Sequence, residues 1–308
     1  MPIDKLIPML LAGDNRMLAR AISMVENELP DAGRLLDSIY HKSSSAYRLG
    51  ITGPPGAGKS SLVDRLIGQF RAADLAVGII SVDPTSPFSG GALLGDRFRM
   101  SEHYLDARVF IRSMASRGDT GGLAARSQEA GDLVAAAGYD VIIFETVGVG
   151  QVELDVMEAV DSTVVVLIPE SGDEIQLMKA GIVEIADIFV INKSDREGAK
   201  KLRHILEQLL DVKEENTDES WRPPVCNTSA LKNEGIEVLH EHIQKHLQHL
   251  HSSGSKVAKQ RARFEGRVRG LIAEASMASF WNGERTAYLK DHINVYSPYE
   301  LARNILEL

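Results

Sequence analysis

The segment Gly53-Pro-Pro-Gly-Ala-Gly58-Lys59-Ser60 constrains the fold of this chain more than any other stretch. It has the spacing G-x-x-x-x-G-K-[ST], in which glycines let the backbone curl inward so that its N–H groups point at a phosphate. A β-rich run, 47–52, precedes it and an amphipathic run, 61–70, follows it. The amino end of a helix adds a partial positive charge to such a loop. The sequence therefore predicts a strand, a phosphate-binding loop and a helix in succession.

From residue 47 onward, short β-rich runs alternate with helical runs. Several of the β-rich runs are apolar on both faces, as expected for parallel strands that are covered on both sides. The alternation predicts βαβ units and an α/β fold of the P-loop nucleoside triphosphatase class, with a central, mostly parallel sheet flanked by helices. The predicted strands are residues 48–52, 77–82, 108–112, 141–144, 163–168, 188–191 and 225–228.

Helical extensions are expected on both sides of this domain. Residues 1–45 carry apolar stripes at helical spacing, and Gly13-Asp14-Asn15 predicts a break followed by a new helix cap. The phosphate-binding domain is assigned to residues 46–251, and the polar stretch 252–255 predicts a linker. Residues 252–308 are assigned to a helical arm, with a helix over 257–280 and an exposed tail to Leu308.

Composition bounds the class of protein. The chain has 308 residues, 44% of them hydrophobic, which is enough for a substantial core. A formal net charge of −9 argues against binding of nucleic acid or of an anionic membrane. The single cysteine, Cys226, excludes an internal disulfide and fits a reducing compartment. The sequence shows no basic leader and no apolar run near the roughly 18 residues of a membrane helix, so a cytoplasmic protein is expected.

Within the phosphate loop, Lys59 is expected to reach the β- and γ-phosphates of a nucleotide, and Ser60 to offer its hydroxyl to Mg²⁺. In-line attack of water on the γ-phosphate then needs mainly positioning and charge neutralisation. The residues predicted to contact the phosphates are Gly53, Pro54, Pro55, Gly56, Ala57, Gly58, Lys59, Ser60 and Ser61.

The motif Asn192-Lys193-Ser194-Asp195, which follows the apolar run 188–191, predicts that the base is guanine. Guanine presents two donors on one edge, N1–H and the 2-amino group, and one carboxylate accepts both, whereas adenine lacks that pair. We assign Asp195 to this role. Asn192 is expected to brace the loop, and the stem of Lys193 to cover one face of the base.

A second loop is expected at the base because it follows the next predicted strand. It comprises Ser229, Ala230 and Leu231. A backbone N–H in this loop, that of Ala230, is predicted to meet the guanine carbonyl. The expected ligands are therefore GTP and GDP together with Mg²⁺.

Three carboxylates are candidate contacts for the metal. Asp83 and Glu145 each end a predicted strand, and ligand-binding loops leave the carboxyl ends of parallel strands. Asp96 lies in a glycine-rich loop that could close on the γ-phosphate, as a metal contact or by positioning water. Asp140 begins a strand and so lies at the opposite edge, which indicates a capping or surface role. Mg²⁺ keeps several waters, so Ser60 and one carboxylate would suffice.

Catalytic roles beyond the metal are assigned in the loop after residue 145. Gly148 is expected to offer its N–H to the γ-phosphate, in a loop that reorganises when that phosphate leaves. Gln151 could orient water, but an ordinary polar loop residue is the favoured interpretation. Arg97 and Arg99 are candidates for an arginine finger, and slow intrinsic hydrolysis is expected. The residues assigned to catalysis are Lys59, Asp96, Glu145 and Gly148.

Five histidines, His240, His242, His246, His249 and His251, fall in one predicted helix. His242, His246 and His249 share a face at i, i+4 and i+7, a spacing that could hold a metal ion. The same helix carries an apolar stripe with these histidines along its flank. A solvated helix edge is therefore the favoured interpretation.

Taken together, the motifs resemble those of the MeaB/ArgK family of methylmalonyl-CoA mutase-associated GTPases. Besides the phosphate loop and the motif ending in Asp195, the resemblance is carried by D-P-T-S…G-G…G-D-R over 83–97, R-S-M…R-G…G-G-L over 112–123 and E-T-V-G-V-G-Q over 145–151. It covers nearly the whole chain, and the string over 83–97 is specific.

The resemblance implies a GTPase that is slow alone and faster with a B12-dependent acyl-CoA mutase, that gates cobalamin delivery and that protects the mutase. It implies a homodimer joined through the C-terminal helices, with an adenosyltransferase as a further candidate partner. By resemblance, Asp173, Gln176 and Lys179 couple the nucleotide state to the mutase, although Asp173 also suits a helix amino end.

Alternatives remain open at this point. One is a GTPase that delivers nickel, for which the histidines are the only signal and the lack of CxxC is unfavourable. The other is an ArgK-type transport-associated kinase or ATPase, which Asp195 disfavours. The strings at 85–88 and 97–99 differ from other family members, which leaves open the identity of the acyl-CoA mutase.

Overall fold

The computed structural model describes residues 2–43, 46–83, 100–103, 105–115, 120–146, 148, 151–169, 182–214 and 221–308. The chain divides into two compact units, Met1–Lys256 and Val257–Leu308. Each unit is described by itself.

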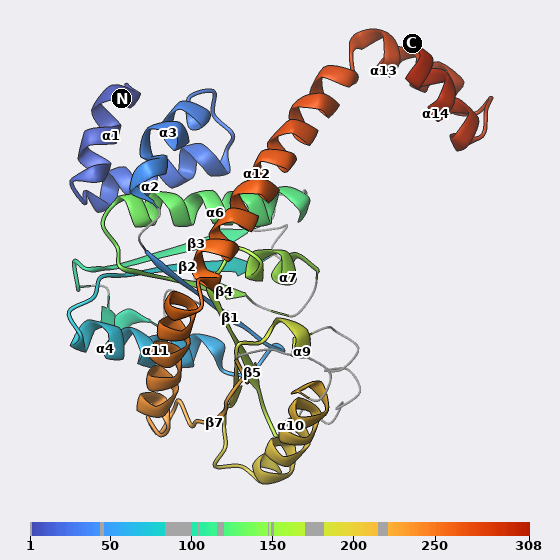
Figure 1. Cartoon of the computed structure of the whole chain (residues 1–308). Coiled ribbons are helices and arrows are strands. Elements are labelled where there is room, and N and C mark those ends of the chain that lie inside the picture. Colours follow the sequence, from blue (N-terminus) through green and yellow to red (C-terminus); the bar gives the residue numbers. More distant parts are fainter. Residues whose placement is uncertain are drawn as a thin grey trace. The chain divides into compact units, whose positions relative to one another are not determined.

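The centre of the first unit is a seven-stranded sheet in the order β3-β2-β4-β1-β5-β6-β7, with every strand pair parallel (Figure 1). This confirms the predicted fold class. All seven predicted strands are present, with ends shifted by at most three residues. Their bounds are β1 Tyr47–Thr52, β2 Val77–Asp83, β3 Val109–Ala115, β4 Val141–Thr146, β5 Ser162–Leu167, β6 Ile188–Ile191 and β7 Val225–Asn227.

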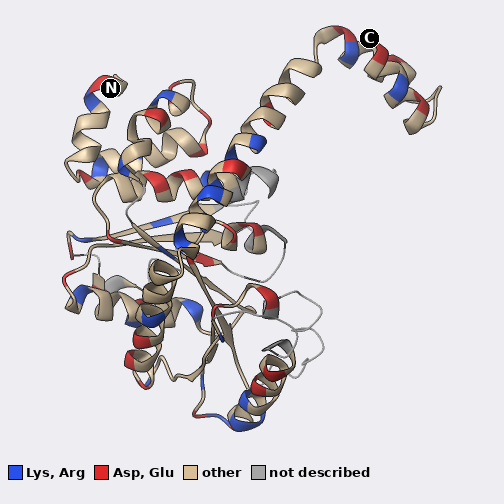
Figure 2. Ribbon diagram, in the orientation of Figure 1, with Lys and Arg blue, Asp and Glu red and all other residues tan. Residues whose placement is uncertain are grey.

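Helices cover both faces of the sheet because the central strands are apolar on both sides. The strands β5 and β6 carry no charged residue, and the charges of this unit gather on helices and loops (Figure 2). One face packs against α4 (Lys59–Ala72) and α11 (Ile236–Ser252) through side chains that include Phe70 and Leu239. The other packs against α6 (Thr120–Ala136) and α7 (Gln151–Met157), and α10 (Ala199–Glu214) covers β5 and β6. Short elements are η1 Tyr40–Lys42, η2 Ser101–His103 and α9 Ile182–Ile185.

The N-terminal residues form three helices, α1 Ile3–Leu11, α2 Asn15–Glu26 and α3 Ala32–Ile39. The Asp14 carboxylate caps α2 by accepting hydrogen bonds from the backbone N–H groups of Arg16 at 2.8 Å and Met17 at 3.1 Å, which confirms the predicted break. The apolar stripes of these helices share one core with α6. Arg112 of β3 adds polar contacts to Ser23 and Glu26 of α2. The helices thus belong to the same compact unit as the sheet.

The C-terminal residues form α12 Ser255–Phe280, α13 Gly283–His292 and α14 Pro298–Glu307. The tail after Phe280 is mostly exposed, as expected, but it also forms two helices whose bounds were not predicted. Two capping residues explain the two extra helices: the Asn282 side chain accepts from the Arg285 N–H at 2.9 Å, and the Ser297 hydroxyl accepts from the Glu300 N–H at 3.3 Å.

None of the described helices is long and apolar enough to cross a membrane.

Candidate nucleotide-binding site

The phosphate loop lies between the end of β1 and the first turn of α4. Gly53 and Gly58 have positive φ angles of 146° and 86°. A Cβ atom at Gly53 would collide with the carbonyl oxygen of Val166, and one at Gly58 with the side-chain nitrogen of Asn192. Only glycine therefore lets the loop curl this closely against its neighbours.

The Lys59 side chain folds back over this loop. Its Nζ donates to the carbonyl oxygens of Gly53 at 2.7 Å and of Pro54 at 3.0 Å, and the residue is buried. These carbonyls hold the ammonium group at the loop. A phosphate oxygen, which carries more negative charge than a carbonyl, could replace them.

Ser60 and Glu145 meet beside the loop. The Ser60 hydroxyl donates to Glu145 Oε1 at 2.6 Å, and both residues are buried. Glu145 reaches this place because β4 pairs with β1, in the register Ile51↔Glu145. A hydroxyl and a carboxylate are the oxygen donors that Mg²⁺ accepts, so these residues fit the expected ion.

Two threonines that were not predicted from the sequence anchor Gly148. The carbonyl oxygen of Gly148 accepts hydrogen bonds from Thr52 Oγ1 at 3.0 Å and from Thr146 Oγ1 at 3.2 Å, and Thr146 Oγ1 also donates to Thr52 Oγ1 at 2.9 Å. Both threonines are fully buried at the carboxyl ends of their strands. Each threonine places a hydroxyl at the end of a strand next to a glycine-rich loop, and this pattern in the sequence could have predicted their role.

Asn192 joins three loops. Its Nδ2 donates to the carbonyl oxygen of Ala57 at 2.8 Å, and its Oδ1 accepts from Thr228 Oγ1 at 3.1 Å and from the Ala230 N–H at 3.2 Å. The Ala230 N–H was expected to meet the guanine carbonyl, but in this structure it is donated to Asn192. Asn192 thus ties the phosphate loop to both loops expected around the base.

Asp195 forms an ion pair with Lys232 at 3.0 Å. Hydrogen bonds from Lys232 and Ser229 hold the pKa of the Asp195 carboxyl below its ordinary value, and the same pair raises the pKa of Lys232. The carboxylate is therefore ionised, as the acceptance of two guanine donors requires. Lys232, which was not predicted from the sequence, is brought to Asp195 by the turn after Leu231.

The remaining residues assigned to the base and the phosphates are described by their backbone conformation and exposure. Lys193, next to Asn192, adopts a positive φ of 56°, and the Leu231 side chain is exposed. Ser61 lies half-buried in the first turn of α4. Of the remaining phosphate-loop residues, Pro55 and Gly56 are exposed, Pro54 is half-buried and Ala57 is buried.

Several assigned residues lie partly or wholly outside the described residues. Asp83 ends β2, where it pairs in register with Ala115 of β3, but its side chain is not described. Gln151 begins α7, again without a described side chain. The residues outside the described ranges are Asp96, Arg97, Arg99, Asp173, Gln176 and Lys179.

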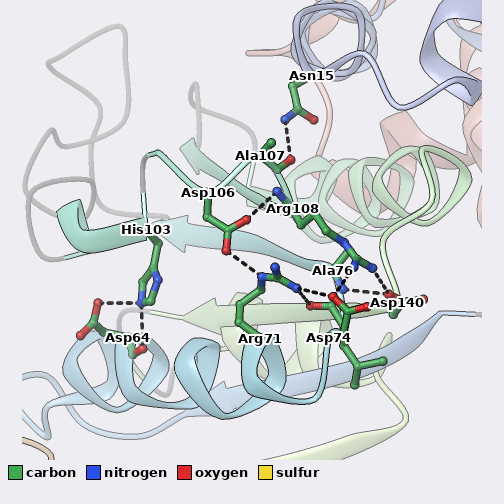
Figure 3. Close-up of polar contacts among 11 residues, drawn as sticks. Asn15, Asp64, Arg71, Asp74, Ala76, His103, Asp106, Ala107, Arg108 and Asp140 are labelled. Atoms are coloured by element: carbon green, nitrogen blue, oxygen red, sulfur yellow. Dashed lines mark hydrogen bonds and ion pairs between the residues drawn. The ribbon is translucent and has the colours of Figure 1, made fainter.

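Asp140 lies at the opposite edge of the sheet, as predicted. Its carboxylate accepts from the Ala76 N–H at 2.8 Å and forms an ion pair with Arg108 at 3.6 Å (Figure 3). Arg108 also pairs with Asp74 at 2.6 Å, and Arg71 with Asp106 at 2.7 Å. This network joins the starts of the strands to the end of α4.

The histidine helix differs from the expected solvated edge. His246 is 2% exposed, its Nδ1 is hydrogen-bonded to Ser162 Oγ at 2.6 Å, and its Nε2 lies 3.4 Å from Asp187 Oδ1. Its ring also packs 4.7 Å from that of Trp221, measured between centroids. The side chain faces the sheet because α11 turns this position inward. In the described part of the chain, no three metal-binding side chains cluster suitably for an ion.

Comparisons with known proteins agree on one family. The model of the family described as methylmalonyl-CoA mutase-associated GTPase MeaB matches residues 18–285. A Pyrococcus horikoshii protein provisionally named as a GTPase is 46% identical over 314 residues, covering 99% of this chain and 98% of that protein. The mouse mitochondrial methylmalonic aciduria type A homolog is 33% identical over 90% of this chain and 71% of its own length. A crystal structure described as a LAO/AO transport system kinase has a TM-score of 0.74 and 30% identity, over 99% of this chain and 96% of that one.

Proposed function

The chain belongs to the MeaB family of methylmalonyl-CoA mutase-associated GTPases, and from this membership we propose that it is a GTP-hydrolysing chaperone of a B12-dependent acyl-CoA mutase. Its class as a GTPase follows from the family and the fold. The proposed role is to gate the loading of cobalamin into the mutase and to protect the mutase from inactivation. The observation that carries this proposal is the family match over residues 18–285.

Contacts at the phosphate loop support hydrolysis by positioning and charge neutralisation. When GTP binds, the Lys59 ammonium group leaves the carbonyls of Gly53 and Pro54 for the β- and γ-phosphate oxygens. Ser60 and Glu145 are the described residues that would hold Mg²⁺, and the bound ion neutralises charge on these phosphates. The N–H of Gly148 is proposed to contact the γ-phosphate, with its own peptide held by Thr52 and Thr146.

Recognition of guanine is proposed for the loops that Asn192 joins. The ionised Asp195 carboxylate accepts the two donors of the base, with Lys232 keeping it ionised. The ion pair with Lys232 leaves further acceptor sites on the carboxylate, because two oxygens offer about four lone-pair positions. The Ala230 N–H reaches the guanine carbonyl only by sharing or leaving its bond to Asn192.

The partner and the assembly are part of the same proposal. The family description names methylmalonyl-CoA mutase, and the mouse relative is named for a disorder of methylmalonate. Residues 252–308 are the proposed dimerisation arm: α12 has no buried residue and exposes large apolar side chains that mark an association surface. These include Phe264, Leu271, Ile272 and Met277.

Nickel delivery and kinase activity are less well supported. Among the described residues, the helix α11 presents no histidine cluster for a metal, since His246 is buried against Ser162. A kinase or ATPase role would use adenine nucleotides, and Asp195 favours guanine.

Turnover of GTP by the purified protein, alone and with a panel of B12-dependent acyl-CoA mutases, tests the proposal. Stimulation by one mutase is expected, with little turnover of ATP and none by Lys59→Ala. An adenosyltransferase added to the mutase tests that further partner. If no mutase stimulates turnover and Ni²⁺ binds tightly instead, the chaperone role is wrong and the GTPase class still stands.

A further inference from the structure

A row of three polar side chains crosses the sheet beside the phosphate loop. Ser81 of β2 lies in register with Ser113 of β3 on one side and with Glu145 of β4 on the other. Residues in register on neighbouring parallel strands present their side chains to the same face of the sheet. The three therefore share the face that α4 covers, where Ser60 meets Glu145.

The rows next to it on this face are apolar. Two residues before Ser81 on β2, the in-register row consists of three isoleucines: Ile111, Ile79 and Ile143. Two residues earlier again, the row consists of three valines: Val109, Val77 and Val141. Five of these side chains belong to the core under α4, and the partly buried Ile111 packs against it. Polarity thus begins abruptly at the row of Ser81, at the edge where the phosphate loop lies.

Among the described residues, no hydrogen-bonding group compensates for the burial of the two hydroxyl groups in this row. Ser81 is 3% exposed, and within the described part of the chain neither Ser81 Oγ nor Ser113 Oγ has a hydrogen-bond partner. A buried hydroxyl without a partner destabilises the folded protein. Alanine would fill the same position on the strand without that cost, so packing alone does not account for serine at either position.

The row ends at the residues proposed to hold Mg²⁺. The Ser81 hydroxyl makes no direct hydrogen bond to the Glu145 carboxylate in this structure. Because neighbouring strands lie about 4.8 Å apart, one water can bridge the two groups. Carboxylates that hold a metal are oriented by donors in a second layer, and loss of such a donor weakens metal binding. We propose that Ser81 is a positioning residue for Mg²⁺, which orients the Glu145 carboxylate toward the ion, and that Ser113 supports it from β3.

This inference rests on the proposed function, because it assumes that Mg²⁺ binds with nucleotide at Ser60 and Glu145. The variant Ser81→Ala tests it in the full-length protein. The readout is the Mg²⁺ concentration that half-maximally slows the release of a fluorescent GDP, and we expect it to rise about tenfold. The melting temperature of the nucleotide-free variant should be unchanged or higher, since an uncompensated hydroxyl is removed.

Two further serine variants serve as comparisons. Ser113→Ala, one strand further from Glu145, should shift the Mg²⁺ dependence less than Ser81→Ala. Ser162→Ala removes a hydroxyl that has a partner, His246 at 2.6 Å, at the amino end of β5. It should lower the melting temperature and leave the Mg²⁺ dependence as in the wild type.

The outcomes separate the inference from the function on which it rests. A wild-type Mg²⁺ dependence in Ser81→Ala overturns the role of Ser81. Ser81→Thr keeps the hydroxyl and should restore the wild-type value, so an equal shift in both variants would indicate a packing effect and also overturn it. If GDP release from the wild type ignores Mg²⁺, the metal site at Ser60 and Glu145 is itself wrong, and the role of Ser81 is wrong with it.

Discussion

Replacing Asn192 with alanine should weaken guanine-nucleotide binding about 100-fold. The change removes three hydrogen bonds, to Ala57, Thr228 and Ala230, from a side chain that is 2% exposed. Each such bond contributes about 1 kcal/mol net, so about 3 kcal/mol of loop organisation is lost. If nucleotide binding must restore this loop arrangement, the lost free energy is subtracted from the binding free energy. Each 1.4 kcal/mol lost weakens affinity about tenfold, so about 3 kcal/mol corresponds to about 100-fold.

Titration of the variant with a fluorescent GDP measures this effect, and thermal unfolding of the nucleotide-free protein measures its share of overall stability. Asn227→Ala is the matched control, because Asn227 is an exposed asparagine at the end of β7, near the same loops. It should bind GDP like the wild type. A change below about threefold in Asn192→Ala would show that Asn192 does not organise the site, because it corresponds to well under 1 kcal/mol.

Three further predictions concern the base, the buried histidine and the single thiol. Asp195→Asn should shift the preference from guanine to xanthine nucleotides, since the amide no longer accepts both guanine donors; competition between GTP and XTP measures this, and a retained GTP preference contradicts the base assignment. His246→Ala should lower the free energy of unfolding by about 2 kcal/mol, through a lost buried hydrogen bond and a cavity; urea unfolding checks it, Ni²⁺ affinity should not change, and unaltered stability would contradict the structural role. Burial raises the pKa of the Cys226 thiol to about 11 from 9.0, so about one thiol in a thousand is ionised at pH 8 in the folded protein. The unfolded thiol ionises first, so this group's contribution to stability is complete below pH 9 and is lost as the pH rises toward 11. Alkylation should accordingly be slow until urea is added, and rapid alkylation of the folded protein would show that Cys226 is not buried.

Most of the fold was predictable because its signals are local. The strand, glycine-rich loop and helix around Gly53 and Lys59 are consecutive in the sequence, and the apolar strands alternate with helices in a way that permits few topologies. The cap at Asp14 was readable for the same reason. The bounds of the two helices after Phe280 were missed although Asn282 and Ser297 are ordinary capping residues. The apolar stripe of α13 is weak, but α14 has a clear stripe that buries Leu301 and Ile305, so its signal was local and was overlooked.

The site was only partly predictable, because its contacts join residues far apart in the chain. That Ser60 and Glu145 meet depends on the pairing of β1 with β4, and the anchoring of Gly148 by Thr52 depends on the same pairing. The ion pair of Asp195 with Lys232 depends on where the turn after β7 lies. The spacing of residues along the sequence does not predict these contacts.

Sequence alone thus determined which chemical groups are proposed to meet a nucleotide: a phosphate loop, the Asp195 carboxylate for the base, and carboxylates at strand ends. These follow from residue types at short spacing, which set backbone conformation and donor chemistry locally. Only the tertiary structure decided which groups face one another. In the folded protein, His246 points inward and is hydrogen-bonded to Ser162, and the Ala230 N–H donates to Asn192. Ser81 lies in register with Glu145. Strand register and helix rotation depend on how the whole core packs, so they cannot be predicted from any single segment of the sequence.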